Sequence, residues 1–143
     1  MATQDEAPTA FFSKTYDEAT GLLMEARDYL AAEEHVDRAG LALGDRLRLT
    51  CETIRLTARL TQIMAWLLAR RAVFAGELTP VEASCPPYRL ERNETLADGD
   101  PTAYENLPEI LSELMDRSHR LYIRVARLDQ LAQRTAHLAP PWG

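Results

Sequence analysis

The residues best suited to chemistry form a row of arginines with one tryptophan between positions 45 and 76. At 3.6 residues per turn they share one stripe of a single helix. Arginine and tryptophan together are enriched at protein–protein interfaces, where they anchor a partner. The spacing therefore predicts a protein-binding surface that consists of Arg48, Arg55, Arg59, Gln62, Trp66 and Arg70.

Charge is distributed unevenly along the chain and offers a second interpretation of this stripe. Residues 13–40 carry three basic and seven acidic side chains, whereas residues 45–76 carry six basic and two acidic ones. Two such helices lying side by side would form ordinary surface ion pairs, each worth about 0–1 kcal/mol. The net charge of -6 disfavours nucleic acid as the main ligand. A DNA-associated regulator that uses the basic helix remains the alternative function.

Catalytic motifs find little support in the sequence. The 6 glycines are scattered, so no glycine-rich phosphate loop is present. A di-metal helical bundle would need Glu-x-x-His on two helices, and the nearest approximation, Asp116 to His119, occurs once. Cys51 and Cys85 have no second pair to complete a tetrahedral metal site, so reduced thiols are expected. We expect no enzyme activity, no cofactor and no metal.

Helices must position these residues, because the composition disfavours strands. Aromatic residues make up 7% of the chain, and 6 Gly with 8 Pro are too few for a turn-dense sandwich or barrel. Apolar residues recur instead at helical spacing. The sequence predicts one all-α domain of 143 residues, an antiparallel three-helix bundle with helices over about 13–38, 45–76 and 104–138.

Capping signals set the expected limits of the first two helices. Thr15 and Glu18 have capping-box spacing, which starts the first helix near residue 13 and leaves residues 1–12 frayed. Asp45 is the expected N-cap of the second helix. Gly76 supplies the left-handed residue that ends it.

The connection over residues 77–103 interrupts the helical pattern with four prolines. Within it, Thr79 as a cap and Pro80 at the first helical position predict a short helix. A connection of this length is uncommon in a compact domain and is usually functional or mobile.

The second helix has two apolar faces, whereas a helix in a small monomeric bundle normally has one. The first face consists of Leu49, Leu56, Leu60, Ile63, Leu67 and Phe74. The second consists of Leu47, Cys51, Ile54, Ala58, Thr61, Ala65 and Leu68. Several of its residues are small enough for close helix packing across a dimer axis. We expect a homodimer interface here; the alternative is cover by another helix of the same chain.

Targeting signals are not evident in the sequence. No window approaches 18 uninterrupted apolar residues, and the first six residues are acidic rather than basic. We expect a cytoplasmic protein without a membrane anchor.

Two segments of the chain look familiar. The first is Phe11–Ala19 leading into Glu25–Leu30, and the second is Arg55–Leu68 leading into Arg71–Val73. Together they resemble the RcdA family, the regulators of CtrA degradation in alphaproteobacteria. The resemblance covers roughly residues 11–80 well and the third helix only by its pattern.

This resemblance implies a dimeric helical bundle that acts as a non-enzymatic adaptor. With a response-regulator priming factor and a cyclic-di-GMP-binding partner, such an adaptor helps bring cell-cycle regulators to the ClpXP protease. The protease's unfoldase would supply ATP hydrolysis, which agrees with the lack of a nucleotide motif. The resemblance also implies an association with a cell pole.

Overall fold

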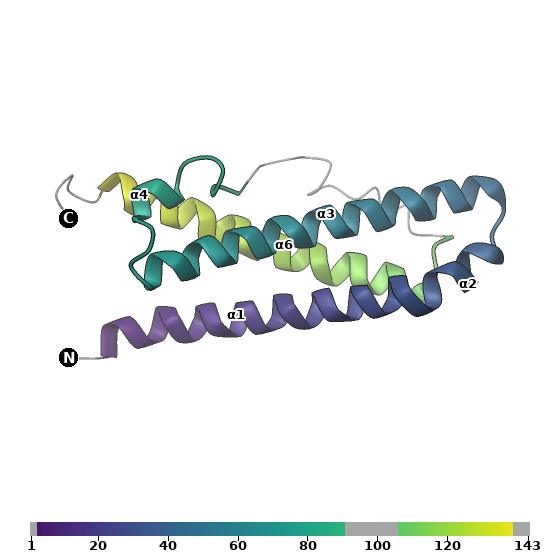
Figure 1. Cartoon of the computed structure of the whole chain (residues 1–143), viewed down its shortest axis with the longest axis horizontal. Coiled ribbons are helices and arrows are strands. Elements are labelled where there is room, and N and C mark those ends of the chain that lie inside the picture. The colour runs from purple at the N-terminus through teal and green to yellow at the C-terminus, as the bar shows by residue number, and fades with distance from the viewer. Residues whose placement is uncertain (1–2, 91–105, 139–143) are drawn as a thin grey trace.

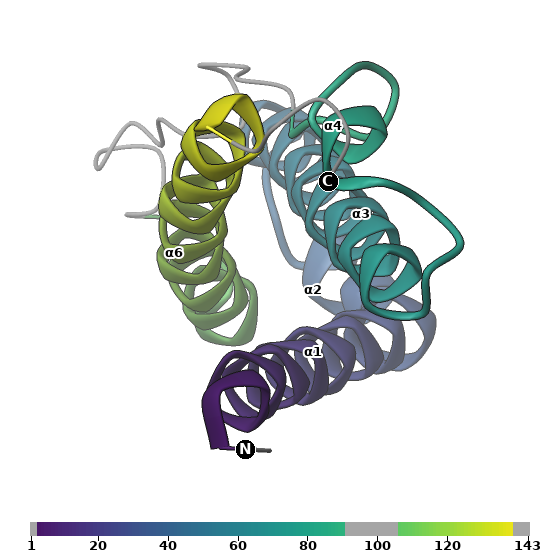
Figure 2. The same ribbon diagram turned by 90° about the vertical axis from the view of Figure 1, so that its left-hand side faces the viewer.

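A computed structural model describes residues 3–90 and 106–138 of the chain. Its three long helices are α1 (Thr3–Asp28), α3 (Leu43–Phe74) and α6 (Glu109–Leu138). They lie along a common long axis (Figure 1), and an end-on view shows them at the corners of a triangle (Figure 2). The expected all-α bundle is confirmed, and the described residues contain no strand.

The direction of α6 differs from the expected antiparallel arrangement. Helix α1 runs opposite to both others, but α3 and α6 run in the same direction (Figure 1). Side-chain contacts agree. Arg59 of α3 bonds to Ser118 of α6, and Trp66, later in α3, bonds to Asp129, which is later in α6. The physical reason is chain length. At up to about 3.3 Å per residue, residues 75–108 can return along the whole bundle before α6 begins.

Helix α1 begins at Thr3, so the expected fraying of residues 1–12 is wrong for the described part of that segment. Phe12 lies inside this helix, and its ring meets that of Phe74 edge-on with centroids 5.2 Å apart. Thr15 lies within the helix, where its hydroxyl donates to the carbonyl four residues earlier at 3.0 Å. It therefore does not start a capping box.

The helical path of α1 continues through a π-helical turn, Tyr29–Glu33, into α2 (Glu34–Ala39). The Tyr29 hydroxyl donates to Asp37 Oδ2 at 3.0 Å and so links the π-helical turn to α2. The segment ends at Ala39, close to the expected residue 38, and Gly40 follows.

Helix α3 begins before Asp45, the expected cap, and has no side-chain cap. Its other end follows the sequence. Gly76 has a φ of 76°, its N–H donates to the carbonyl of Val73 at 3.1 Å, and the N–H of Glu77 donates to that of Ala72 at 2.9 Å. This is a Schellman motif, in which a left-handed glycine satisfies the last carbonyls of a helix.

A short helix, α4 (Pro80–Ala83), begins where the sequence predicts it, because Thr79 Oγ1 accepts a hydrogen bond from the N–H of Glu82 at 3.1 Å. Helix α6 begins at Glu109, later than the expected residue 104. Residues 91–103 of the expected 77–103 connection lie outside the described residues, as does residue 104 itself.

The core lies between the three long helices. Every member of the first apolar face of α3 is buried except Phe74. It packs on the apolar stripes of α6 and of α1 with its π-helical continuation, whose buried members include Leu22, Tyr29, Leu111, Leu114, Met115, Leu121, Tyr122 and Val125. Each buried Leu, Met or Val contributes about 1.5–3 kcal/mol of hydrophobic free energy.

Two acidic side chains of α1 form ion pairs with α6. The charge distribution in the sequence had instead suggested ion pairs between α1 and α3. Glu25 pairs with Arg117 and Glu18 with Arg124, each at 2.6 Å. Their side chains are about half exposed, so each pair contributes about 0–1 kcal/mol.

Candidate functional site

The predicted arginine and tryptophan stripe does not lie on one surface. Arg48 is exposed, and Arg55 and Gln62 are half-buried. Arg59, Trp66 and Arg70 are buried, so the expectation that they form an exposed partner surface is wrong. These residues are buried because α6 packs against this side of α3 and supplies hydrogen-bond acceptors for Arg59 and Trp66.

Arg59 is fully buried and joins α3 to α6. Its Nη1 donates to the carbonyl of Met115 at 2.9 Å and to Ser118 Oγ at 2.8 Å. Ser118 is itself fully buried, and its hydroxyl also donates to the Met115 carbonyl, at 3.0 Å. The sequence signal was a single serine within the apolar stripe of the third helix.

Trp66 makes the second polar link between these helices. Its indole Nε1 donates to Asp129 Oδ1 at 2.8 Å, and Gln133 Nε2 donates to Asp129 Oδ2 at 2.7 Å. Asp129 is buried, so both carboxylate oxygens receive a hydrogen bond in place of water. Sequence reasoning missed Asp129, although an aspartate one turn from Gln133 on an apolar face was visible.

Arg70 is buried in a different way. Its side chain is 9% exposed, and its guanidinium lies over the ring of Trp66, 5.4 Å from the centroid. Among the described residues, Nε and Nη2 are buried without a hydrogen-bond partner. Burial lowers the pKa of Arg70, and the negative charge of Asp129 opposes this shift.

An apolar groove of about 580 Å³ surrounds Arg70. It lies where the start of α1 meets the ends of α3 and α6, the end of the bundle that faces the viewer in Figure 2. Its larger lining side chains are Phe11, Phe12, Trp66, Phe74, Leu128 and Leu131. No sequence motif pointed to it, because it is assembled from three distant helix ends. We call it the end groove.

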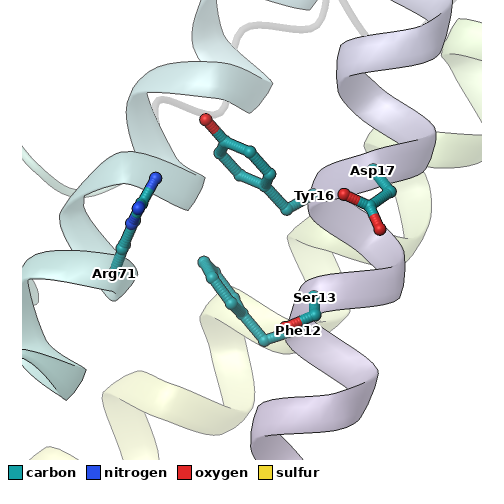
Figure 3. Close-up of a pocket in the computed structure, with 5 residues that line it drawn as sticks. All are labelled: Phe12, Ser13, Tyr16, Asp17 and Arg71. Atoms are coloured by element: carbon teal, nitrogen blue, oxygen red, sulfur yellow. The ribbon is translucent and has the colours of Figure 1, made fainter.

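A smaller hollow of about 260 Å³ lies between α1 and α3. Figure 3 shows the rings of Phe12 and Tyr16 directed toward Arg71, while Asp17 points away. The Arg71 guanidinium lies 5.7 Å from the centroid of the Tyr16 ring. This cation–π contact, worth about 0.5–1 kcal/mol at an exposed site, holds α1 against α3.

The second apolar face of α3, here called the α3 outer face, consists of Leu47, Cys51, Ile54, Ala58, Thr61, Ala65 and Leu68, and no other described helix covers it. Ile54 is 63% exposed, and Leu47 and Leu68 are also largely exposed. Cys51, Thr61 and Ala65 are exposed and Ala58 is half-buried. The alternative that another helix of the same chain covers this face is therefore wrong for the described residues.

Basic side chains on α3 leave little open cationic surface. Arg59 and Arg70 are buried, and Arg55 pairs with Glu52 at 3.2 Å. Arg46 donates to the carbonyl of Leu41 at 2.8 Å. A continuous basic stripe, which a DNA-binding helix would need, is not formed by these residues.

Metal-binding clusters and membrane-spanning helices are two features that the described residues lack. Residues 3–90 and 106–138 contain no group of three or more His, Cys, Asp or Glu side chains placed to hold a metal ion. Across those ranges, every helix is too short or too polar to cross a membrane. Cys51 and Cys85 are both free, exposed thiols.

Comparisons with known proteins agree with this architecture. A family model described as a protein of unknown function (DUF1465) matches residues 3–141. The crystal structure of RcdA from Caulobacter crescentus CB15 is 35% identical to this chain, with a TM-score of 0.69. The similarity covers 85% of this chain and 89% of that one. The chain belongs to the RcdA family.

The RcdA resemblance of residues 11–80 is thus confirmed and extended, because the family match also includes α6. The sequence matches no curated protein.

Proposed function

We propose that this chain is a non-enzymatic adaptor of the RcdA kind, which helps deliver cell-cycle regulatory proteins to the ClpXP protease. The observation that carries this proposal is the 35% identity to RcdA over 85% of the chain, with the same fold. An adaptor needs surfaces that bind proteins, and the unfoldase of the protease supplies ATP hydrolysis. Its partners would be the ClpXP machinery, a response-regulator priming factor, a cyclic-di-GMP-binding protein and the cargo.

The α3 outer face supports a role in protein association. Soluble monomers rarely expose a continuous apolar patch, and those that do commonly use it to bind another protein. Leu47, Ile54 and Leu68 recur along one side of α3 and are all at least half exposed. Ala58, Thr61 and Ala65 lie between them, and such small side chains allow two helices to approach closely.

A second copy of the chain is the occupant proposed for this face. An isologous dimer places the same face of both subunits in contact, so one apolar stripe is complementary to itself. The interface would be formed by Leu47, Cys51, Ile54, Ala58, Thr61, Ala65 and Leu68 of each copy. The exposed Arg48 and the half-buried Arg55 and Gln62 would flank it and remain accessible to partners.

A crosslinked pull-down from an alphaproteobacterial lysate tests the adaptor proposal. The tagged chain and a tag-only control are compared by mass spectrometry after the same crosslinking. Enrichment of the ClpX unfoldase together with a response regulator or a cell-cycle transcription factor is expected. Recovery of the chain alone would contradict the proposal. Recovery only of nucleoid proteins that are lost on nuclease treatment would favour the DNA-associated alternative.

A further inference from the structure

Arg70 is a charged residue in the wall of the largely apolar end groove, and apolar packing does not explain it. Its side chain is more than nine-tenths buried, and its Nε and Nη2 have no hydrogen-bond partner among the described residues. A buried donor without a partner loses its hydration with nothing in return, which costs about 1–3 kcal/mol and more for a charged group. The cation–π contact with Trp66 offsets this cost only in part.

The carboxylate of Asp129 does not accept a hydrogen bond from the buried Nε and Nη2 of Arg70. Asp129 lies close enough to affect the Arg70 charge, but its two oxygens accept from Trp66 at 2.8 Å and from Gln133 at 2.7 Å. No ion pair between Arg70 and Asp129 forms in the described structure. Arg70 lines the end groove, so its guanidinium, whose Nε and Nη2 are shielded from water, places a positive charge without an ion-pair partner among the described residues in the groove wall.

We propose that the end groove binds a peptide segment of a partner protein, in which apolar side chains lie next to a carboxylate that pairs with Arg70. The volume of about 580 Å³ is within the usual range for ligand sites, and the lining is largely aromatic and aliphatic. An anionic group at Arg70 and apolar groups along the rest of the groove complement its charge and its lining.

The shape of the groove favours a peptide over a fatty acyl chain. Phe11, Phe74 and Leu131 line the groove yet are each about half exposed, so one side of a bound ligand would face water. A peptide can place its polar backbone on that side, whereas an acyl chain would leave apolar surface exposed.

This site is separate from the adaptor proposal, because it lies at the end of the bundle and none of its lining residues belongs to the α3 outer face. Its test uses neither ClpXP nor cargo. If the groove binds no peptide, the adaptor proposal is unaffected. If the pull-down recovers no adaptor partners, the peptide-binding proposal is unaffected.

Titration of the full chain followed by NMR tests the proposal. The reporter is the indole N–H signal of Trp66, assigned with a Trp142→Phe variant. Three probes are used: N-acetyl-Leu-Phe-Leu with a free C-terminal carboxylate, the same tripeptide as its C-terminal amide, and octanoate. We expect the free acid to bind at least tenfold more tightly than the amide, and more tightly than octanoate.

Two arginine variants form a matched pair for this experiment. Arg70→Gln should remove the preference for the acid over the amide, whereas Arg71→Gln, which changes the adjacent residue outside the groove, should keep it. The acid and amide comparison on the unaltered chain stands even if Arg70→Gln does not fold.

Four outcomes would overturn the proposal. They are equal affinity for acid and amide, a preference that survives Arg70→Gln, octanoate binding as tightly as the tripeptide, and no shift of the Trp66 signal at millimolar peptide.

Discussion

The guanidinium of Arg59 on α3 donates to Ser118 Oγ on α6 at 2.8 Å, inside the core and 59 residues apart in sequence. The same Nη1 bonds to the carbonyl of Met115. A buried charge in such a position needs good hydrogen-bond geometry to be tolerated. This contact therefore fixes how α6 is placed along α3.

Replacing Arg59 should destabilise the fold. Arg59→Ala removes a fully buried side chain and both hydrogen bonds to α6. The cavity and the lost bonds together should lower the free energy of unfolding by about 3 kcal/mol. Urea denaturation followed by circular dichroism measures this. Arg48→Ala, which truncates an exposed arginine of the same helix, should change it by less than about 0.5 kcal/mol. Equal effects of the two variants would show that Arg59 is not a structural link.

Trp66 and Asp129 should behave as a coupled pair. Trp66→Phe keeps a ring in the core but removes the N–H that Asp129 Oδ1 accepts. Loss of a hydrogen bond to a buried charged group should cost about 2 kcal/mol. In a double-mutant cycle with Asp129→Ala, the effect of Trp66→Phe should fall below about 1 kcal/mol. Strict additivity would exclude the coupling.

Alkaline pH should destabilise the chain through Tyr29. Burial and the hydrogen bond to Asp37 raise the pKa of Tyr29 well above its ordinary value of 10.0. The unfolded chain therefore loses this proton first, and the contribution of Tyr29 to stability is full below pH 10 and falls as the pH rises. Between pH 10 and pH 11 this should cost about 1 kcal/mol more in the unaltered chain than in Tyr29→Phe. Unfolding curves measured between pH 9 and pH 11 check this. Parallel losses in both proteins would contradict it.

Dimerisation through the α3 outer face can be separated from folding. Ile54 is 63% exposed in the single chain, so Ile54→Arg should leave the monomer folded but place a charge in the proposed interface. Light scattering after size-exclusion chromatography should then give the mass of a monomer. Val36→Arg on α2 is a matched control, because Val36 is also 63% exposed and β-branched, and it should remain dimeric. If Ile54→Arg is still dimeric, the α3 outer face is not the dimer interface.

Helical spacing predicted the elements that pack by apolar periodicity. The inward face of α3 and the glycine stop at Gly76 follow the sequence, because both depend on local spacing and on backbone conformation. The start of α1 does not: the helix begins at Thr3, before the capping-box spacing of Thr15 and Glu18, and Phe12 within it contacts Phe74, a residue far along the chain. The direction of α6 likewise depends on the path of the connection, which local spacing does not encode.

Burial of the arginine stripe could not be predicted from spacing alone. A charged residue is normally expected at the surface, because it is rarely buried unless another residue pairs with it. Ser118 and Asp129 are those partners, and each interrupts an apolar stripe of α6. The end groove was missed for a similar reason, because it brings together Phe11, Arg70 and Leu131 from three helices.

The adaptor role is the central claim, and reconstituted proteolysis tests it most directly. A cell-cycle regulator is incubated with purified ClpXP, ATP, the response-regulator priming factor and the cyclic-di-GMP-binding protein, with or without this chain. We expect the cargo to be degraded several-fold faster when the chain is present, while a protease substrate that needs no adaptor is degraded at an unchanged rate. Equal rates of cargo degradation with and without the chain would contradict it.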